Sequence, residues 1–409
     1  MALKRVVVTG LGAITPIGNN FQEYWNALLK GVSGAGPITL FDATNFKTRF
    51  ACEVKGYNPE DHFEKKDVRK YDRCAQLGLI SSKEAVETSR ILEYTELDKS
   101  RVGVIWGSGI GGLNTFEQEV TEFAQGNGIP RFNPFFIPKM IADMTPGLVS
   151  MQYGFMGPNY ATVSACASSS NAIIDSAMLI RLGKADAIIT GGSEAAICAS
   201  GVGGFNALHA MSTRNDDPST ASRPFDKDRD GFVLGEGSGT LILEEYEHAV
   251  KRGATIYAEV VGGGLSADAY HMTAPHPEGL GAYNVMKNAI EDAGISITDI
   301  DHINVHGTST PLGDLAESKA ILKLFGDHAY NIQINSTKSM TGHLLGAAGA
   351  IEALSCIGAM REGIVPPTIN HFTDDDEFDP KLDFTFNKAK EKKVNYAMSN
   401  TFGFGGHNA

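Results

Sequence analysis

The chain has 409 residues, of which 42% are hydrophobic and 46 are glycines, so it is long enough for two or three domains or a fused duplication and too apolar to be disordered. Its net charge of −13 argues against nucleic acid as the main partner. The cysteines are widely spaced and form no C-x-x-C pair, which argues against a disulfide framework or a zinc site and fits a reduced protein. They are Cys52, Cys74, Cys166, Cys198 and Cys356.

Neither a signal peptide nor a membrane span is expected. The N-terminal sequence M-A-L-K-R-V-V-V-T-G has only a three-residue apolar run before Thr9. No later segment approaches the ~20 apolar residues that a membrane-spanning helix needs. The sequence therefore predicts a soluble cytoplasmic protein.

The first half of the chain alternates buried-type strands with helices. Residues 37–60 are expected to be mixed loop, and the segment 126–146, rich in proline, phenylalanine and glycine, a long ordered excursion. The predicted elements are a strand over 4–10, a helix over 21–29, a helix over 75–89, a strand over 101–106, a strand over 161–164 with a helix after Cys166, and a strand over 185–192.

The second half repeats this order. It predicts a strand over 256–262, a helix over 283–293, a strand over 300–306, a helix over 315–325, a strand over 332–336, a helix over 345–361 and a strand over 393–399. R-V-G-V-I-W-G-S-G in the first half corresponds to H-I-N-V-H-G-T in the second, in order and character rather than in identity. The chain is therefore interpreted as a duplication with parallel-rich sheets covered by helices.

Cys166 lies in the segment T-V-S-A-C-A-S-S-S, between a short strand and a helix. Unpaired N–H groups and the macrodipole at a helix N-terminus favour an anion, so a thiol placed there should be more acidic than its free pKa of about 8.5. The helix end alone should lower the pKa by about one unit. A lone cysteine is more often an inert buried thiol.

Two histidines favour a catalytic role for Cys166 over that of an inert buried thiol. His306 follows a predicted strand in H-G-T-S-T-P, where loops of α/β proteins carry active groups. His343 follows K-S-M-T-G and opens a small-residue helix, which makes it the expected counterpart of Cys166 in the other half. If the halves pack about a pseudo-twofold axis, the three side chains would converge into a catalytic site.

Two further motifs have weaker functional readings. The turn 107–112, G-S-G-I-G-G, satisfies the dinucleotide pattern, but the residues after it do not give the expected βαβ unit, so a tight turn over a substrate pocket is preferred. Residues 226–231, D-K-D-R-D-G, resemble the start of a calcium loop. The twelfth position, however, is Gly237, and Glu236 comes one residue too early, so a charged surface or dimer-side turn is preferred.

Taken together, these motifs closely resemble the condensing enzymes of the thiolase superfamily, specifically the bacterial β-ketoacyl-[acyl-carrier-protein] synthases. The resemblance covers essentially the whole chain, and the opening segment looks most like the elongating synthase called type II. It rests on V-V-V-T-G-L-G-A-I-T-P-I-G, S-A-C-A-S-S-S, H-G-T-S-T-P, N-S-T-K-S-M-T-G-H-L-L-G-A-A-G and N-T-F-G-F-G-G-H-N. The Cys/His/His set differs from the Cys/His/Asn set of type III and chalcone-synthase-like members and from the second cysteine of thiolases.

The resemblance implies a thiolase-like five-layered α-β-α-β-α fold from two duplicated halves, placed at 1–250 and 251–409, and a homodimer. It also implies fatty-acid chain elongation without a cofactor, because acyl carrier protein supplies both substrates on its phosphopantetheine arm. Cys166 would carry the acyl chain as a thioester. Malonyl-acyl carrier protein would lose CO2, and the resulting enolate would attack that thioester.

Each site residue receives a role by its position in the family motifs. His306 and His343 would donate hydrogen bonds to the enolate, Lys338 would tune the electrostatics around His343, and Glu352 would support them; an ordinary buried ion pair is the alternative for Lys338 and Glu352. The backbone N–H groups of Cys166 and Phe404 would form an oxyanion hole, with Phe404 as a gate. The remaining assignments are Thr308 and Thr310 on the phosphopantetheine arm and Ile110 in the wall of the acyl pocket.

The basic segment 64–73 resembles a docking site for an acidic carrier protein. Lys66, Arg69 and Lys70, called here the basic patch, would make the contact, although a solvated helix face is the simpler alternative. Two alternatives share the chemistry, namely a type I elongating synthase and a polyketide-type ketosynthase. A non-catalytic chain-length partner subunit is a remote one, because such subunits lack the nucleophilic cysteine.

Overall fold

The computed structural model describes residues 3–409, which form two main sheets and three small ones, with helices between and around the main sheets. The first sheet has the order β5-β4-β6-β7-β1-β8. Its strands are β5 (Asn159–Thr162), β4 (Val102–Gly107), β6 (Ala187–Glu194), β7 (Gly237–Glu245), β1 (Val6–Ile14) and β8 (Ala258–Glu259). β4, β5 and β6 are parallel, whereas β7 runs antiparallel to both of its neighbours.

The second sheet is built from three parallel strands. They are β11 (Gln333–Asn335), β10 (His302–Asn304) and β14 (Ala397–Ser399), with β10 in the middle. The short pairs are β2 (Gly36–Pro37) with β3 (Phe50–Ala51), β12 (Ile364–Val365) with β13 (Lys390–Glu391), and β15 (Phe402–Gly403) with β16 (His407–Asn408) and β9 (Ser266–Ala267).

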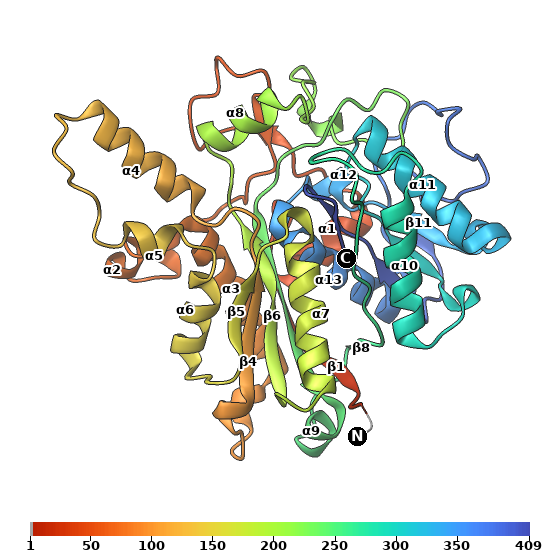
Figure 1. The fold of residues 1–409 in the computed structure, drawn as a ribbon, viewed down its shortest axis with the longest axis horizontal. Coiled ribbons are helices and arrows are strands. Elements are labelled where there is room, and N and C mark those ends of the chain that lie inside the picture. The colour runs from red at the N-terminus through yellow and green to blue at the C-terminus, as the bar shows by residue number, and fades with distance from the viewer. Residues whose placement is uncertain (1–2) are drawn as a thin grey trace.

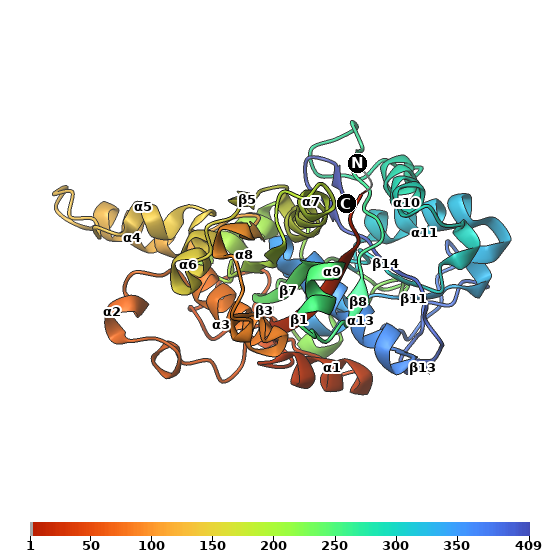
Figure 2. The ribbon, with the colours of Figure 1, turned by 90° about the horizontal axis from the view of Figure 1, so that it is seen from below.

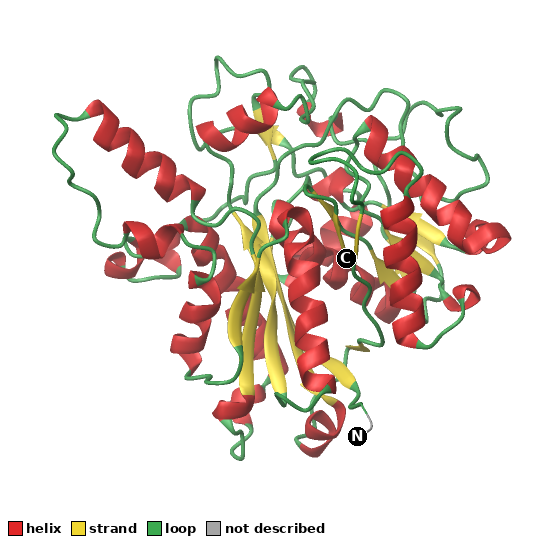
Figure 3. Ribbon diagram, viewed as in Figure 1, coloured by secondary structure: helices red, strands yellow, loops and turns green. Residues whose placement is uncertain are grey.

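The helices complete five layers, as predicted. α3 (Arg73–Ser89) and α6 (Met144–Tyr153) cover the outer face of the first sheet, and α7 (Ser168–Arg181) and α13 (Ala348–Glu362) cover its inner face. α13 also packs on the second sheet, whose core includes α10 (Leu280–Ala293) and α11 (Pro311–Phe325). Figure 3 shows helices on both sides of the first sheet. The other helices are α1 (Phe21–Lys30), α2 (Lys65–Val68), α4 (Leu113–Gln125), α5 (Phe136–Met140), α8 (Ala199–Ala207), α9 (Tyr246–Lys251) and α12 (Lys338–Thr341).

Local sequence explains these boundaries. All nine residues of β1 are buried, because both faces of the first sheet are covered. α1 begins where the side chain of Asn20 accepts a hydrogen bond from the N–H of Glu23, and it ends at Gly31 with a φ of 67°. The central core joins side chains from both halves, among them Leu11, Ile180 and Ile351.

Most predicted elements are present. The longest elements that had no prediction are β7, α4, α6 and α8. The predicted strand over 256–262 is only the short β8, which pairs with β1 in the first sheet. Figures 1 and 2 both place α4 and α5 at one end of the molecule and α10 and α11 at the other. No helix within residues 3–409 is both long and apolar enough to cross a membrane.

The duplication is visible in the topology. β4 lies between two parallel neighbours, β5 and β6, just as β10 lies between β11 and β14. β5 leads through a short 3-10 turn into α7, and β11 leads through α12 and a similar 3-10 turn into α13. The inner helices α7 and α13 therefore occupy equivalent places, which brings the loops that follow β5 and β11 to the same region.

Candidate active site

Cys166 lies in a sharp turn that joins β5 to α7. The turn is a single 3-10 segment, Ala165–Ala167, directly before the first residue of α7. Ala165 has a φ of 52°, a left-handed conformation that residues with a Cβ atom rarely adopt. Cys166 is 8% exposed and lines a cavity. The turn thus holds the sulfur between a helix end and a cavity.

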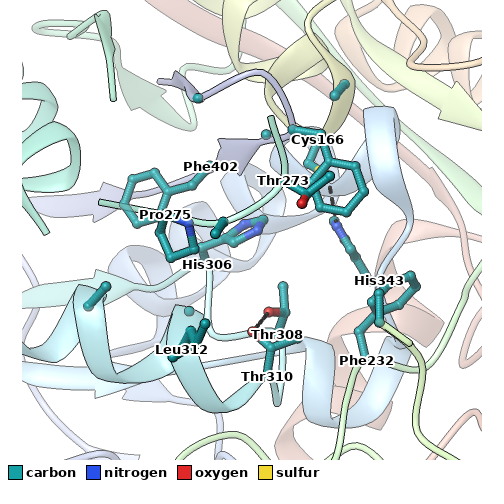
Figure 4. Close-up of a pocket in the computed structure, with 18 of the residues that line it drawn as sticks. Cys166, Phe232, Thr273, Pro275, His306, Thr308, Thr310, Leu312, His343 and Phe402 are labelled. Carbon is teal, nitrogen blue, oxygen red and sulfur yellow. Dashed lines mark hydrogen bonds between the residues drawn. The ribbon is translucent and has the colours of Figure 1, made fainter. Parts of the chain in front are cut away.

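The two predicted histidines converge on this thiol. His343 Nε2 is 3.0 Å from Cys166 Sγ, and the rings of His306 and His343 meet edge to face with centroids 5.3 Å apart. One sulfur or nitrogen atom from each of the three residues lies within 4.8 Å of the others. Figure 4 shows the three side chains pointing toward one another. The predicted convergence of residues from the two halves is therefore present.

Both histidines are neutral at physiological pH. Burial lowers the pKa of His306 and of His343 well below the usual value, and the positive charge of Lys338 lowers both further. Within residues 3–409, the Nδ1 atoms of the two rings have no hydrogen-bond partner. With the proton on Nε2, both imidazoles can donate hydrogen bonds into the cavity without carrying charge.

The position of His306 is fixed by a buried carboxylate that the sequence analysis did not single out. Glu317, on α11, accepts hydrogen bonds from the backbone N–H groups of His306 and Gly307, each at 2.9 Å. Its first oxygen also accepts a hydrogen bond from Asn400 Nδ2 at 3.2 Å. These bonds hold the loop after β10 in the direction of Cys166.

The prediction of an acidic thiol is wrong for the unliganded site. Burial raises the pKa of Cys166 to about 12, and this outweighs the opposing influence of Lys338 and of the backbone N–H groups of Phe404 and Cys166. The helix end favours the thiolate, but the closed cavity removes water from the sulfur, and this desolvation favours the neutral thiol. The thiolate must therefore be stabilised by its neighbours during the reaction.

Lys338 and Glu352 form a buried ion pair beside the histidines. Lys338 is 1% exposed, and its Nζ binds Glu352 Oε1. Burial raises the pKa of Glu352 to about 7, against the lowering effect of Lys338. Because Lys338 also acts on the pKa values of His306, His343 and Cys166, the pair is more than an isolated structural contact. Neither Lys338 nor Glu352 lines the cavity.

The glycine-rich turn near Phe404 lies against Cys166. A Cβ atom on Gly403 would come within 2.7 Å of Ser164 O and 3.1 Å of Cys166 N, so only glycine fits this approach. The backbone N–H groups of Phe404 and Cys166 both stabilise the thiolate. Two backbone N–H donors therefore lie beside the sulfur. The side chain of Phe404 lines the cavity.

The cavity has a volume of about 450 Å³ and a largely apolar wall. Ile110, Thr308 and Thr310, for which the family resemblance implies substrate contacts, all line it. The hydroxyls of Thr308 and Thr310 are 2.9 Å apart, and Figure 4 shows both residues on the side of the cavity away from Cys166. The cavity thus runs from the threonines to the thiol.

The two weaker motifs both contribute to this cavity. Gly109 and Ile110 of the G-S-G-I-G-G turn line it, as expected for a turn over a pocket. The interpretation of residues 226–231 as a charged surface turn holds for the exposed Lys227, Asp228 and Asp230 but is wrong for Asp226. Asp226 is buried and accepts hydrogen bonds from the N–H groups of Phe372 and Thr373, while Asp230 and Gly231 line the cavity.

The predicted equivalence of His343 and Cys166 is wrong. The 3-10 turn before α13 is Leu345–Ala347, and Leu345 has a φ of 47°, close to the 52° of Ala165 in the turn before α7. Gly346 is therefore the structural counterpart of Cys166, and His343 lies before the turn. The prediction paired Cys166 and His343 from the order of motifs in the two halves of the chain. The backbone conformation of the two turns instead defines which positions are equivalent.

The basic patch is separate from the cavity. Lys66 lies in α2, and Arg69 and Lys70 follow it. Lys66 pairs with Glu64 at 2.7 Å and Lys70 with Asp67 at 3.1 Å, while Arg69 is exposed. None of the three residues lines the cavity. Local acids thus partly offset the charge of the patch.

A second buried carboxylate, Glu194, was also missed. It is the last residue of β6, it is fully buried, and its oxygens contact the turn that contains Ile110. Burial raises its pKa to about 7. A carboxylate directly after the predicted strand over 185–192 was the available signal, since groups at the carboxyl ends of strands often serve a site.

Family models match both halves of the chain. The model described as Beta-ketoacyl synthase, N-terminal domain, matches residues 3–249, and the model of the C-terminal domain matches residues 257–372. The chain is 50% identical over 408 residues to the 3-oxoacyl-[acyl-carrier-protein] synthase 2 of Coxiella burnetii, with 100% of this chain and 98% of the relative covered.

Solved structures share the fold. A β-ketoacyl synthase from Burkholderia phymatum has a TM-score of 0.91 at 36% identity, covering 99% of this chain and 98% of that one. A ketosynthase structure from a type II polyketide system, in complex with its acyl-carrier protein and bound to the hexaketide, has a TM-score of 0.90 at 33% identity, covering 99% and 98%.

Proposed function

The chain belongs to the β-ketoacyl synthase family, and we propose that it elongates fatty acyl chains by decarboxylating Claisen condensation, with Cys166 as the nucleophile. The observation that carries this proposal is the 3.0 Å contact between Cys166 Sγ and His343 Nε2, with His306 beside them at the cavity. The substrates are an acyl thioester and malonyl-acyl carrier protein, and the products are 3-oxoacyl-acyl carrier protein and CO2.

The first step transfers the acyl chain to Cys166. The sulfur attacks the thioester carbonyl, the pantetheine sulfur leaves, and the thiol proton of Cys166 ends on that leaving sulfur. His343 Nε2–H can stabilise the forming thiolate, and the N–H groups of Cys166 and Phe404 can hold the oxyanion of the tetrahedral intermediate. This assistance compensates for the raised pKa of the buried thiol.

The second step forms the new carbon–carbon bond. When malonyl-acyl carrier protein loses CO2, the bonding electron pair becomes an enolate, whose oxygen needs hydrogen-bond donors. Neutral His306 and His343 supply two, each worth roughly 3–4 kcal/mol in a preorganised site. The enolate carbon then attacks the acyl thioester, and Cys166 leaves as the thiolate. Lys338 favours the neutral histidines and the thiolate, and Glu352 balances its charge.

We assign the phosphopantetheine arm to Thr308 and Thr310, the acyl-pocket wall to Ile110, and the gate to Phe404, because all four residues line one cavity. Acyl carrier protein would dock on the basic patch, whose exposed Arg69 lacks the nearby acidic partners of the two lysines. A solved relative bound to its acyl-carrier protein supports this class of partner. No other cofactor is required.

We further propose a division into halves near residue 250 and a homodimer. The outer strand β5 has exposed residues at its edge, and Val163 and Met178 nearby are 62% and 47% exposed. Pairing of two β5 edges would cover this apolar surface. The protein would work in the cytoplasm, where the free cysteines of the described chain stay reduced.

The fatty-acid substrate is preferred to a polyketide one. The 50% identity to a 3-oxoacyl-[acyl-carrier-protein] synthase 2 exceeds the 33% identity to the polyketide ketosynthase structure. The presence of Cys166 argues against a non-catalytic partner subunit.

The test is intact-mass detection of the acyl-enzyme after incubation with acyl-acyl carrier protein. Cys166→Ala should abolish the acyl adduct, whereas Cys198→Ala, which removes a buried thiol that does not line the cavity, should keep it. Persistence of the adduct in Cys166→Ala would refute the assignment of the nucleophile. Assays with malonyl-acyl carrier protein and acyl primers of increasing length then define the substrate range.

A further inference from the structure

Glu194 has no role in the chemistry above, yet it is the most densely bonded carboxylate next to the cavity wall. Its Oε2 accepts hydrogen bonds from the N–H of Gly109 at 2.8 Å and from the N–H of Gly346 at 3.0 Å. Its Oε1 accepts from the N–H of Ile110 at 3.2 Å and from Ser108 Oγ at 3.3 Å. One side chain therefore joins the turn after β4 to the turn before α13.

The surrounding backbone leaves no free space. A Cβ atom on Gly346 would come within 2.2 Å of Gly109 N and 2.7 Å of Glu194 Oε2. A Cβ atom on Gly109 would come within 2.9 Å of the same oxygen and 3.2 Å of Ala165 O. Glu194 thus packs against the Ile110 turn, and this turn packs against Ala165, the residue before Cys166. A shift of the carboxylate would be transmitted to the cavity wall.

The duplication explains why a carboxylate lies here. Gly346 is the structural counterpart of Cys166, so its N–H corresponds to the N–H that faces the thiol. In the first half that N–H remains available for an oxyanion. In the second half the corresponding N–H is already bound by Glu194. The protein fills its second anion-binding position with its own side chain.

We propose that Glu194 is a positioning residue that fixes the turn containing Ile110 relative to Cys166 and thereby sets acyl-chain-length discrimination. The inference rests on the proposed function, because it takes the cavity wall at Ile110 as the acyl pocket. A firmly held turn keeps Ile110 in the cavity, so a longer acyl chain must displace it against the three hydrogen bonds that join this turn to Glu194. The bond from Gly346 N–H anchors the carboxylate itself.

The replacement Glu194→Gln tests whether the carboxylate acts through its hydrogen bonds or only by filling buried space, because glutamine has nearly the same size. A carboxylate offers acceptors on both oxygens, whereas an amide offers one oxygen and an NH2 group that only donates. In either orientation, the NH2 group would face backbone N–H donors, because both carboxylate oxygens accept at least one of them. A buried N–H without an acceptor is strongly unfavourable, so part of the turn is released.

The matched control is Glu84→Gln. Glu84 is partly buried and also holds two backbone N–H groups, those of Ala13 at 2.8 Å and Phe21 at 2.9 Å. Neither of these partners lines the cavity, whereas Gly109 and Ile110, which Glu194 holds, both do. The replacement of Glu84 should lower thermal stability in a comparable way. It should not change how the enzyme ranks acyl chains.

The experiment measures kcat/KM for a long and a short acyl-acyl carrier protein in the wild type, Glu194→Gln and Glu84→Gln. We expect Glu194→Gln to shift the long-to-short ratio toward the longer chain by roughly tenfold, because released hydrogen bonds let Ile110 withdraw. Amide hydrogen exchange of residues 108–112 should rise in the same variant. An unchanged ratio, or an equal shift in Glu84→Gln, would overturn the proposal.

Chemical rescue provides the second test. Glu194→Ala leaves a set of N–H donors facing an empty space, so added formate should restore the wild-type ratio while leaving wild-type enzyme unaffected. Failure of formate to move the ratio would contradict the proposal. If Glu194→Ala does not fold, Glu194→Asp replaces it, and its shorter carboxylate should give a ratio between those of wild type and Glu194→Gln. An unchanged ratio in variants that still elongate refutes this inference alone, whereas wild-type enzyme without elongation refutes the proposed function.

Discussion

Replacing Lys338 with methionine removes the only buried positive charge that acts on Cys166 and on both histidines in the described chain. Two unit charges separated by several ångströms at an effective dielectric near 20 interact by about 2 kcal/mol. Loss of that interaction should slow thiolate reactions of Cys166 roughly thirtyfold. The pH profile of Cys166 alkylation should move to higher pH, because the pKa of the thiol, already about 12, rises further.

The same replacement also affects stability, since Glu352 loses its partner. Breaking a buried ion pair costs about 3–5 kcal/mol, a large share of the ~5–15 kcal/mol that stabilises a domain. The pKa of Glu352 is about 7 with Lys338 present and should rise without it, so the carboxyl becomes neutral and the loss is reduced. This loss is greatest at high pH, where Glu352 would have to be charged without a partner.

The double variant Lys338→Met/Glu352→Gln separates the two effects. Glutamine removes the unpaired carboxylate, so unfolding by denaturant should return toward the wild-type midpoint. Alkylation of Cys166 with iodoacetamide, followed by intact mass across a pH series, should stay slow. If the double variant regained wild-type alkylation, or if Lys338→Met alkylated at the wild-type rate, the electrostatic role of Lys338 would be refuted.

The remaining predictions concern the other parts of the site. His306→Ala and His343→Ala should each lower CO2 release from malonyl-acyl carrier protein by about 10²–10³-fold, because each removes an enolate donor, and full CO2 release by both would exclude that role. Gly403→Ala should slow acylation in a rapid-quench assay, because its Cβ atom would lie 2.7 Å from Ser164 O, and an unchanged rate would show that the turn can move. Charge reversal across the basic patch should raise KM for carrier-bound substrate with little change in kcat, and an unchanged KM would remove the docking assignment.

The sequence was sufficient to predict helix-covered parallel sheets and the convergence of three side chains, because both depend on local patterns and their order, whereas the five layers were predicted from the family resemblance. Cys166, His306 and His343 each follow a predicted strand, and the repeated strand order indicated that their loops would meet. The missed strand β7 is a run of nine buried residues, G-S-G-T-L-I-L-E-E, in which the opening glycines and the closing acids hide the strand pattern. Its two acids are buried because Arg252 pairs with Glu244, while Glu245 accepts a hydrogen bond from the backbone N–H of His248 at the start of α9.

The wrong and missing predictions at the site share a physical cause. The pKa of Cys166, the structural counterpart of Cys166 and the partners of Glu194 all depend on tertiary structure. The pKa of Cys166 is raised by a closed cavity that no local pattern reveals. The counterpart of Cys166 is Gly346, which is recognised by the positive φ angles of Ala165 and Leu345 and not by residue type. The partners of Glu194 come from segments 84 to 152 residues away in the chain.

The separation of 177 residues between Cys166 and His343 also has a consequence during protein synthesis. At ~5–20 residues per second, a ribosome needs roughly 10–35 seconds to extend the chain from one residue to the other. Throughout that interval the nascent thiol can have its helix end but neither His343 nor the glycine turn at Phe404. Acyl loading must therefore wait until the second half is made and docked, so an unfinished polypeptide cannot capture acyl chains that it could not extend.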